Sequence, residues 1–119
     1  MQVQVRASSG IEIREATERW ASEELNEGLA RFRAEITRIE VYLSEERKSA
    51  AGTEDTRCAM EARLARHPAV TVSHYAGGVD ESFRGALRKL RHALESVLDR
   101  EADHRDRQSI RHDLDPVAD

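Results

Sequence analysis

The chain has 119 residues, of which 39% are apolar and 35% charged, and its formal net charge is −4. This length predicts one domain with a core of its own. A single cysteine, Cys58, excludes a disulfide within the chain and fits a reducing compartment. The first ten residues lack the apolar segment of a signal peptide and no 18-residue apolar run exists, so we expect a cytoplasmic protein.

The charge is distributed unevenly. Residues 101–119 hold six carboxylates and three arginines, so this acidic tail carries −3 and residues 1–100 carry only −1. One run of cations has no intervening acid: Arg84, Arg88, Lys89 and Arg91. The overall charge argues against nucleic-acid binding, whereas this local run is compatible with it.

The N-terminal third predicts a strand, a turn and a helix. Residues 1–6 alternate between apolar and polar side chains, which is typical of a short strand, and residues 7–10 predict a turn. Residues 13–33 repeat apolar side chains at three- and four-residue steps, which predicts a helix. A small residue at Gly28 would let this helix lie close to a sheet.

Three further strands are predicted in the middle of the chain. Apolar and polar residues alternate over 38–44, 57–64 and 70–76, so each segment should have one buried face. Residues 45–56 predict a polar loop. His67-Pro68 predicts a turn, because proline cannot donate a hydrogen bond to a sheet ladder.

The last predicted element is an amphipathic helix that begins after Gly77-Gly78, with Asp80 placed to cap it. Past Arg100 the apolar stripe fades, and the tail either prolongs the helix or frays. Pro116 argues against helix near the end. The predicted core stripe consists of Val79, Phe83, Ala86, Leu87, Leu90, Leu94, Val97 and Leu98.

The resulting order is βαβββα, which predicts an α+β fold. The economical arrangement is a two-layer sandwich, with both helices on one face of a four-stranded sheet. Short loops favour antiparallel pairing of strands two to four, and the helical crossover makes the first strand parallel to its neighbour. The domain should cover residues 1–100, followed by the acidic tail at 101–119.

Four ordered segments, ITRIEVYLSE, RCAMEARLA, AVTVSHYA and above all KLRHALE, resemble the ribosome hibernation promoting factor and ribosome-associated inhibitor A family over about residues 1–100. The resemblance implies a fold related to the double-stranded RNA-binding domain. It also implies a short-type factor that binds the small ribosomal subunit, through ribosomal RNA and channel-lining proteins, in the channel used by messenger and transfer RNA. Such factors silence or protect idle ribosomes in starved or cold cells.

Phosphate recognition needs cations on a rigid surface. On the second predicted helix, three arginines fall at i, i+4 and i+7 and form one stripe, with a lysine on the opposite flank where the family has one. Two arginines at the end of the first helix would extend this region if the helices lie side by side. The candidate RNA contacts are therefore Arg84, Arg88, Lys89, Arg91, Arg31 and Arg33.

The same charges have a structural alternative. Asp80–Arg84 and Arg91–Glu95 are i,i+4 pairs, worth about 0.2–0.5 kcal/mol each, and such pairs are typical of a solvated helix face. The chain also departs from the family's lysine-rich helix end, because residues 95–99 read ESVLD. This departure lowers the expected RNA affinity without changing the expected fold.

No catalytic, metal or cofactor site is predicted. Cys58 falls on the core face of its strand, which favours a buried thiol over a nucleophile paired with His74. The five histidines lack zinc spacing with a cysteine pair. Capping explains Asp80 and Glu81, and Gly77-Gly78 lacks the lysine and hydroxyl of a phosphate-binding loop.

Three aromatic residues have two interpretations each. Trp20 is expected in the core or at its edge rather than as a platform for base stacking. Tyr42 and Tyr75 point to the open face of the sheet, where cross-strand packing competes with base stacking as their role.

The sequence thus predicts a non-enzymatic factor that inhibits translation by occupying the small ribosomal subunit. It is expected to be a monomer when free, with no membrane or DNA partner. The alternative is a regulatory protein-interaction module of the same fold with weak or no RNA binding, motivated by the acidic balance. A small thiol enzyme is the third class.

Overall fold

The computed structural model describes residues 1–8, 10–48 and 53–114, with side chains described at 1–8, 10–46 and 55–100. In chain order the elements are β1 (Gln2–Ala7), α1 (Glu15–Gly28), the 3₁₀ turn η1 (Ala30–Phe32), β2 (Ile36–Lys48), β3 (Thr53–Leu64), β4 (Val70–Ala76) and α2 (Val79–Leu114).

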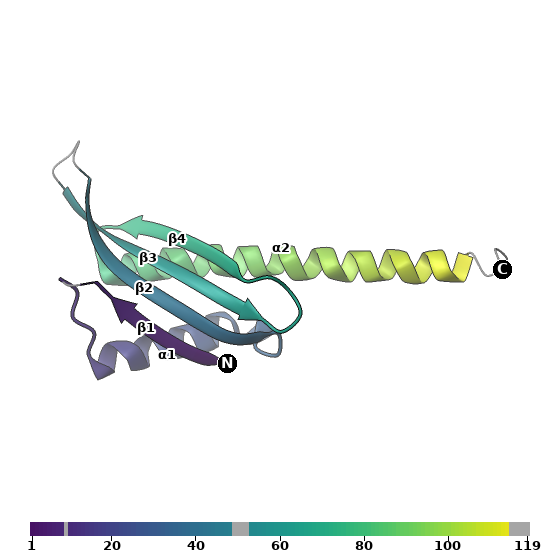
Figure 1. The fold of residues 1–119 in the computed structure, drawn as a ribbon, viewed down its shortest axis with the longest axis horizontal. Coiled ribbons are helices and arrows are strands. Elements are labelled where there is room, and N and C mark those ends of the chain that lie inside the picture. Colours follow the sequence, from purple (N-terminus) through teal and green to yellow (C-terminus); the bar gives the residue numbers. More distant parts are fainter. Residues whose placement is uncertain (9, 49–52, 115–119) are drawn as a thin grey trace.

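The strands form one sheet in the order β1-β2-β3-β4. β1 is parallel to β2, and the other two pairs are antiparallel, as the loop lengths predicted. Both helices cover the same face: α1 lies behind β1, α2 lies behind β3 and β4, and α2 projects well past the sheet (Figure 1). The predicted α+β sandwich is therefore confirmed.

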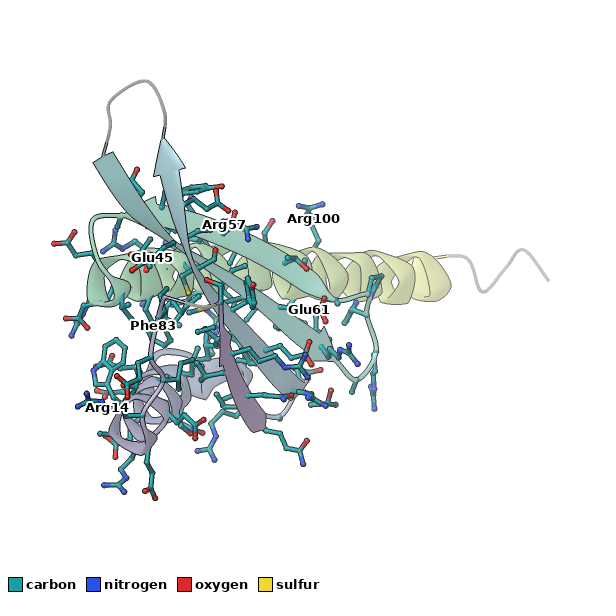
Figure 2. All side chains as sticks on the ribbon, turned by 60° about the vertical axis from the view of Figure 1, so that its left-hand side comes forward. Arg14, Glu45, Arg57, Glu61, Phe83 and Arg100 are labelled. Atoms are coloured by element: carbon teal, nitrogen blue, oxygen red, sulfur yellow. The ribbon has the colours of Figure 1, made fainter. Side chains whose placement is uncertain are left out.

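The core lies between the sheet and the helices. Alternate residues of the two central strands are at most 1% exposed: Ile39, Val41 and Leu43 of β2, and Cys58, Met60 and Ala62 of β3. Phe83, labelled in Figure 2, is the largest of the fully buried side chains. The helices cover the strands with one apolar stripe each, which includes Ala21 and Leu25 of α1 and Phe83, Ala86, Leu90 and Leu94 of α2.

The first helix is shorter than predicted. The α-helix ends at Gly28 rather than continuing to residue 33, and the chain tightens into η1, where Phe32 still reaches the core. A methyl group added at Gly28 would lie 3.0 Å from Leu87 Cδ2 of α2. The missing side chain therefore permits close approach of the two helices, and our expectation of an approach to the sheet was wrong.

The central hairpin is longer than predicted. Most of the expected loop at 45–56 is strand, since the β2–β3 register continues from Glu45↔Thr56 to Lys48↔Thr53. This arm runs beyond β1, whose register ends at Ala7↔Leu43. Without a covering layer it needs no apolar alternation, so the sequence signal for a strand is missing there. Residues 49–52 of the expected loop lie outside the described residues.

The second helix begins at Val79, so Asp80 lies in its first turn and is not the N-cap we predicted. A carboxylate there still stabilises the positive end of the helix dipole. The backbone remains helical to Leu114, so this part of the tail prolongs the helix. Pro116 lies outside the described residues. No described helix is long and apolar enough to span a membrane.

One close contact joins α2 to the sheet. Gly85 is buried, and a methyl group added to it would overlap the imidazole of His74, lying 2.6 Å from its Cγ. His74 stands on the helix side of β4, opposite Cys58. The missing side chain at Gly85 is thus a packing requirement, even though glycine is a poor helix former.

Gly85→Ala is expected to lower the free energy of unfolding by about 1–3 kcal/mol, because overpacking outweighs the better helix propensity of alanine. In a His74→Ala background the same substitution should raise it by up to about 1 kcal/mol. Urea unfolding followed by circular dichroism measures both. A stabilising Gly85→Ala in the wild-type background would show that the imidazole moves aside freely.

Candidate nucleic-acid interface on the two helices

The two helices lie side by side and are joined by charged contacts on their outer side. Arg84 Nη2 of α2 lies 3.9 Å from Glu24 Oε1 of α1. Its guanidinium also sits 5.9 Å from the centroid of the Trp20 ring. Arg84 is therefore in the region predicted for RNA contact, but it already has two partners on α1.

Arg31 makes a matching contact farther along. Its guanidinium lies 3.6 Å from Asp99 Oδ1 and 4.0 Å from Glu95 Oε1 on α2. It also lies 5.3 Å from the centroid of the neighbouring Phe32 ring. The two helices are neighbours, as the extension of the basic region to Arg31 requires. The cations along their contact are, however, accompanied by carboxylates. We call the residues of this strip the inter-helix surface: Arg84, Arg88, Arg91, Arg31, Glu24, Glu95 and Asp99.

Arg88 and Arg91 lie between these two contact points. They are exposed, and they form no hydrogen bond or ion pair within the described part of the chain. A helix turns about 100° per residue. With Leu90 and Leu94 fixed in the core, Arg88 must point away from the sheet. These two guanidinium groups are the free cations of the inter-helix surface.

The other two predicted contacts lie elsewhere. Lys89 is on the opposite flank of α2, and its Nζ donates a hydrogen bond of 2.9 Å to the carbonyl oxygen of Ser73 on the edge strand β4. It thereby satisfies a carbonyl at the sheet edge. Arg33 follows η1, is exposed, and has no ion pair among the described residues.

The two i,i+4 pairs suggested by spacing are replaced by inter-helix pairs. Arg84 bonds Glu24 rather than Asp80, and Glu95 bonds Arg31 rather than Arg91. Sequence reasoning missed the roles of Glu24 and Asp99, because pairing across helices depends on their relative placement. No spacing rule within one helix reveals it.

These ion pairs are weak enough to yield to a ligand. The side chains of Arg31 and Asp99 are 67% and 64% exposed, and exposed pairs typically contribute about 0–1 kcal/mol. A phosphate, like a carboxylate, forms a charge-assisted and often bidentate contact with arginine. Arg31 and Arg84 can therefore exchange a carboxylate for a phosphate at little cost.

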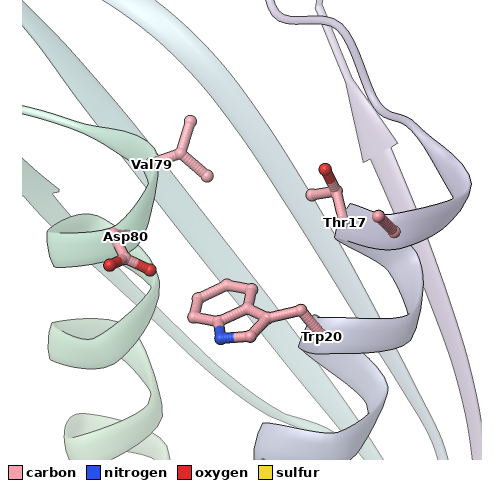
Figure 3. A pocket seen from close by; sticks show the side chains of 5 residues that line it. Thr17, Trp20, Val79 and Asp80 are labelled. Atoms are coloured by element: carbon pink, nitrogen blue, oxygen red, sulfur yellow. The ribbon is translucent and has the colours of Figure 1, made fainter.

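Trp20 lies at the edge of the core. Its ring is 4.7 Å from that of Phe83, centroid to centroid, at an interplanar angle of 49°. Figure 3 shows the indole projecting from α1 towards Val79 and Asp80 of α2, across a hollow of about 390 Å³. The indole thus packs between the two helices at the edge of the core, as one of the two interpretations of Trp20 predicted.

The thiol of Cys58 is unsuited to catalysis. His74 lies directly opposite it on β4, so the topology does bring the two residues together. Burial, however, raises the pKa of the Cys58 thiol from 9.0 to about 12, a shift that the nearby charge of Arg57 only partly opposes. A thiol with this pKa is protonated at neutral pH and is a poor nucleophile. The arrangement argues against a thiol enzyme.

The comparisons with known proteins agree with the fold. The family model for the Sigma 54 modulation protein / S30EA ribosomal protein matches residues 3–106. The N-terminal domain of Protein Y from Thermus thermophilus is similar in structure, with a TM-score of 0.66 and 16% identity, covering 82% of this chain and 99% of that one. A ribosomal subunit interface protein from Coxiella burnetii gives 0.64 and 16%, covering 83% and 99%. No curated protein matches.

The buried thiol should make stability depend on alkaline pH. Folding raises the pKa of the Cys58 thiol from 9.0 to about 12, so the folded state binds the thiol proton more tightly than the unfolded state does. The stability gained in this way is fully present below pH 9 and is lost as the pH rises towards 12. The free energy of unfolding should fall in this window by up to about 1.4 kcal/mol per pH unit. Cys58→Ala should lack this component of the slope, as measured by urea unfolding at several pH values. Parallel slopes for the two proteins would contradict it.

Proposed function

We propose, because this chain belongs to the Sigma 54 modulation protein / S30EA ribosomal protein family, that it is a ribosome-associated hibernation factor acting on the small subunit. In this proposal it binds small-subunit ribosomal RNA through the outer side of its two helices. It thereby occupies the channel for messenger and transfer RNA and inhibits translation. It acts in the cytoplasm as a monomer and without catalysis.

The observation that carries this proposal is the pair of unpartnered arginines on a rigid helix. Arg88 and Arg91 project from α2 at the same level as core residues Leu90 and Leu94, so their backbone positions are fixed by packing. Cations held in this way gain free energy from phosphates by releasing counterions, without first ordering a loop. Arg84 and Arg31 flank them as further phosphate contacts.

Inhibition in this proposal is steric. A folded domain seated in the channel excludes messenger and transfer RNA for as long as it stays bound, and no bond is made or broken. Release then depends on weakening a set of phosphate contacts. A mixed-sign surface such as this one suits reversible binding, because Glu24, Glu95 and Asp99 compete with phosphates for the same arginines.

A regulatory protein-interaction module is the second candidate. It is favoured by the partners found for three of the six predicted cations: Arg31 and Arg84 bond carboxylates, and Lys89 bonds a backbone carbonyl. A salt titration separates the two functions. Binding through phosphates weakens steeply as salt rises, whereas binding through an apolar interface does not.

Arg88→Glu with Arg91→Glu should abolish co-sedimentation with small ribosomal subunits while leaving the unfolding midpoint nearly unchanged, because both side chains are exposed and unpaired. These positions test the surface more cleanly than Lys89, whose replacement would also free the Ser73 carbonyl. Undiminished co-sedimentation would exclude the inter-helix surface as the binding site.

The matched control is Arg14→Glu with Arg19→Glu at the other end of α1. Both side chains are exposed, at 74% and 69%. Each Arg→Glu change lowers the charge by two, so either double variant moves the net charge from −4 to −8. The control should co-sediment like the wild type. An equal loss in both variants would indicate dependence on net charge rather than on a site.

Occupation of the channel predicts competition. Small subunits loaded beforehand with messenger RNA and initiator transfer RNA should retain at least ten-fold less of the protein than empty subunits, because the two ligands exclude each other. Sedimentation of both samples at equal protein concentration measures this ratio. Simultaneous binding would retain ribosome association but refute channel blocking.

A further inference from the structure

The face of the sheet opposite the helices carries two exposed tyrosines. Tyr42 of β2 and Tyr75 of β4 are 43% and 40% exposed, and they are the large hydrophobic residues left exposed in the described part of the chain. They are also the only tyrosines in the sequence. The proposed function uses the helices and assigns no role to this open face.

The charges of the open face divide into two groups. At one end, Arg38 bonds Glu40 at 3.1 Å and Arg63 bonds Glu61 at 3.0 Å, so each cation has a carboxylate. At the tyrosine end, Arg6 and Arg57 have no ion pair among the described residues. The carboxylates at this end are Glu46, which accepts a hydrogen bond from Tyr75, and Asp55 opposite it in the register. The guanidinium groups of this face that have no ion pair among the described residues therefore lie beside the tyrosines.

The register places these groups next to one another. Arg6 is opposite Tyr42 across the β1–β2 pair, and Arg57 is opposite Tyr75 across the β3–β4 pair. On β3 the direct neighbour of Tyr42 is Ala59, too small to cover an aromatic ring. Tyr42 and Tyr75 are separated by two strand spacings and by two residues along the strands, about 12 Å in all, with Arg57 on the strand between them.

A buried hydroxyl completes the group. Ser44 stands opposite Arg57 on β2 and is 8% exposed, and its Oγ has no hydrogen-bond partner within the described residues. A buried hydroxyl without a partner costs free energy. We call these residues the tyrosine patch: Arg6, Tyr42, Ser44, Arg57 and Tyr75.

We propose that the tyrosine patch is a second RNA-binding surface, which stacks unpaired bases of single-stranded RNA on Tyr42 and Tyr75. Arg57 and Arg6 contact the phosphates between and beside the stacked bases. The ligand is single-stranded because the bases of a duplex are covered by their neighbours and offer no free face. The surface lies across the sheet from the inter-helix surface, so both can be occupied together.

Cross-strand packing does not account for the Tyr42 ring. Packing would pair each tyrosine with a large apolar or aromatic neighbour, whereas Tyr42 lies between Arg6 and Ala59. Tyr75 is oriented by a hydrogen bond of 3.1 Å from its Oη to Glu46 Oε2, which leaves the ring 40% exposed. An exposed ring in a fixed orientation beside free guanidinium groups favours RNA over an apolar protein partner.

The two tyrosines allow a direct test. Labelling the full chain with 3-fluorotyrosine gives two ¹⁹F resonances, both from the tyrosine patch. A single-stranded 12-mer of oligo(A) RNA should shift both resonances in a saturable titration at low salt, whereas the same RNA annealed to its complement should not. Absence of any shift by the single strand, or equal shifts by the duplex, would overturn the proposal.

Variants assign the contacts. Tyr42→Leu and Tyr75→Leu should each weaken binding of the 12-mer at least five-fold, the low end for loss of one stacked base, while Tyr42→Phe should retain it. Arg57→Gln should lower the slope of log K against log salt by about 0.7, the value for one contact with a single strand. Arg63→Gln is the matched control on the same strand, because Arg63 is already paired. Equal effects of the two arginine changes would contradict the placement.

This inference depends on the proposed function only for the RNA that the tyrosine patch would meet. An experiment can refute the tyrosine patch without refuting the inter-helix surface, and the reverse. Arg88→Glu with Arg91→Glu should leave binding of the 12-mer at low salt within about three-fold of wild type, because those side chains lie beyond the helix layer. Loss of 12-mer binding in that variant, with unchanged ¹⁹F resonances, would transfer the contact to the helices and overturn the patch.

Discussion

The constraint on which the structure depends is that a sheet with one apolar face must be covered on that face. β2 and β3 direct six nearly unexposed side chains towards the helices. The side chains of α2 that pack in the same core are Phe83, Ala86, Leu90 and Leu94. Burying these residues fixes the rotation of α2 about its axis. That rotation alone sends Arg88 outward, Arg84 towards α1, and Lys89 to the edge of β4. The placement of charge is therefore a result of core packing.

The same constraint gives the two faces of the sheet different chemistry. The helix side is buried and largely apolar. Even its sulfur and imidazole groups serve packing, because Cys58 is a buried thiol and His74 fills the space left by Gly85. The opposite side keeps its polar residues and is free of covering elements in the described chain. Lys89 links the helix layer to the edge of the sheet, where its ammonium group donates a hydrogen bond to the Ser73 carbonyl of the edge strand β4.

The sequence predicted what depends on periodicity. Strand alternation and the helical stripe identified the order of elements, the parallel β1–β2 pair and nearly every core residue, because each follows from burying one face. It did not predict features set by contacts between distant segments. The partner of Arg84 is Glu24 rather than Asp80, and Gly28 faces Leu87 rather than the sheet. The extended hairpin arm was missed because an uncovered strand has no apolar pattern.

The length of α2 has a consequence for how such a protein can change. Among the residues whose side chains the structure describes, the last that packs against the core is Leu98, and the helix backbone continues for about four turns more to Leu114, past the sheet (Figure 1). The backbone of this extension lies beyond the strands, so the sheet does not hold it in place (Figure 1). We therefore expect changes in the length or charge of this extension to affect folding less than changes in the part of the helix that covers the sheet. Natural selection can lengthen, shorten or recharge the extension independently of the body that carries it.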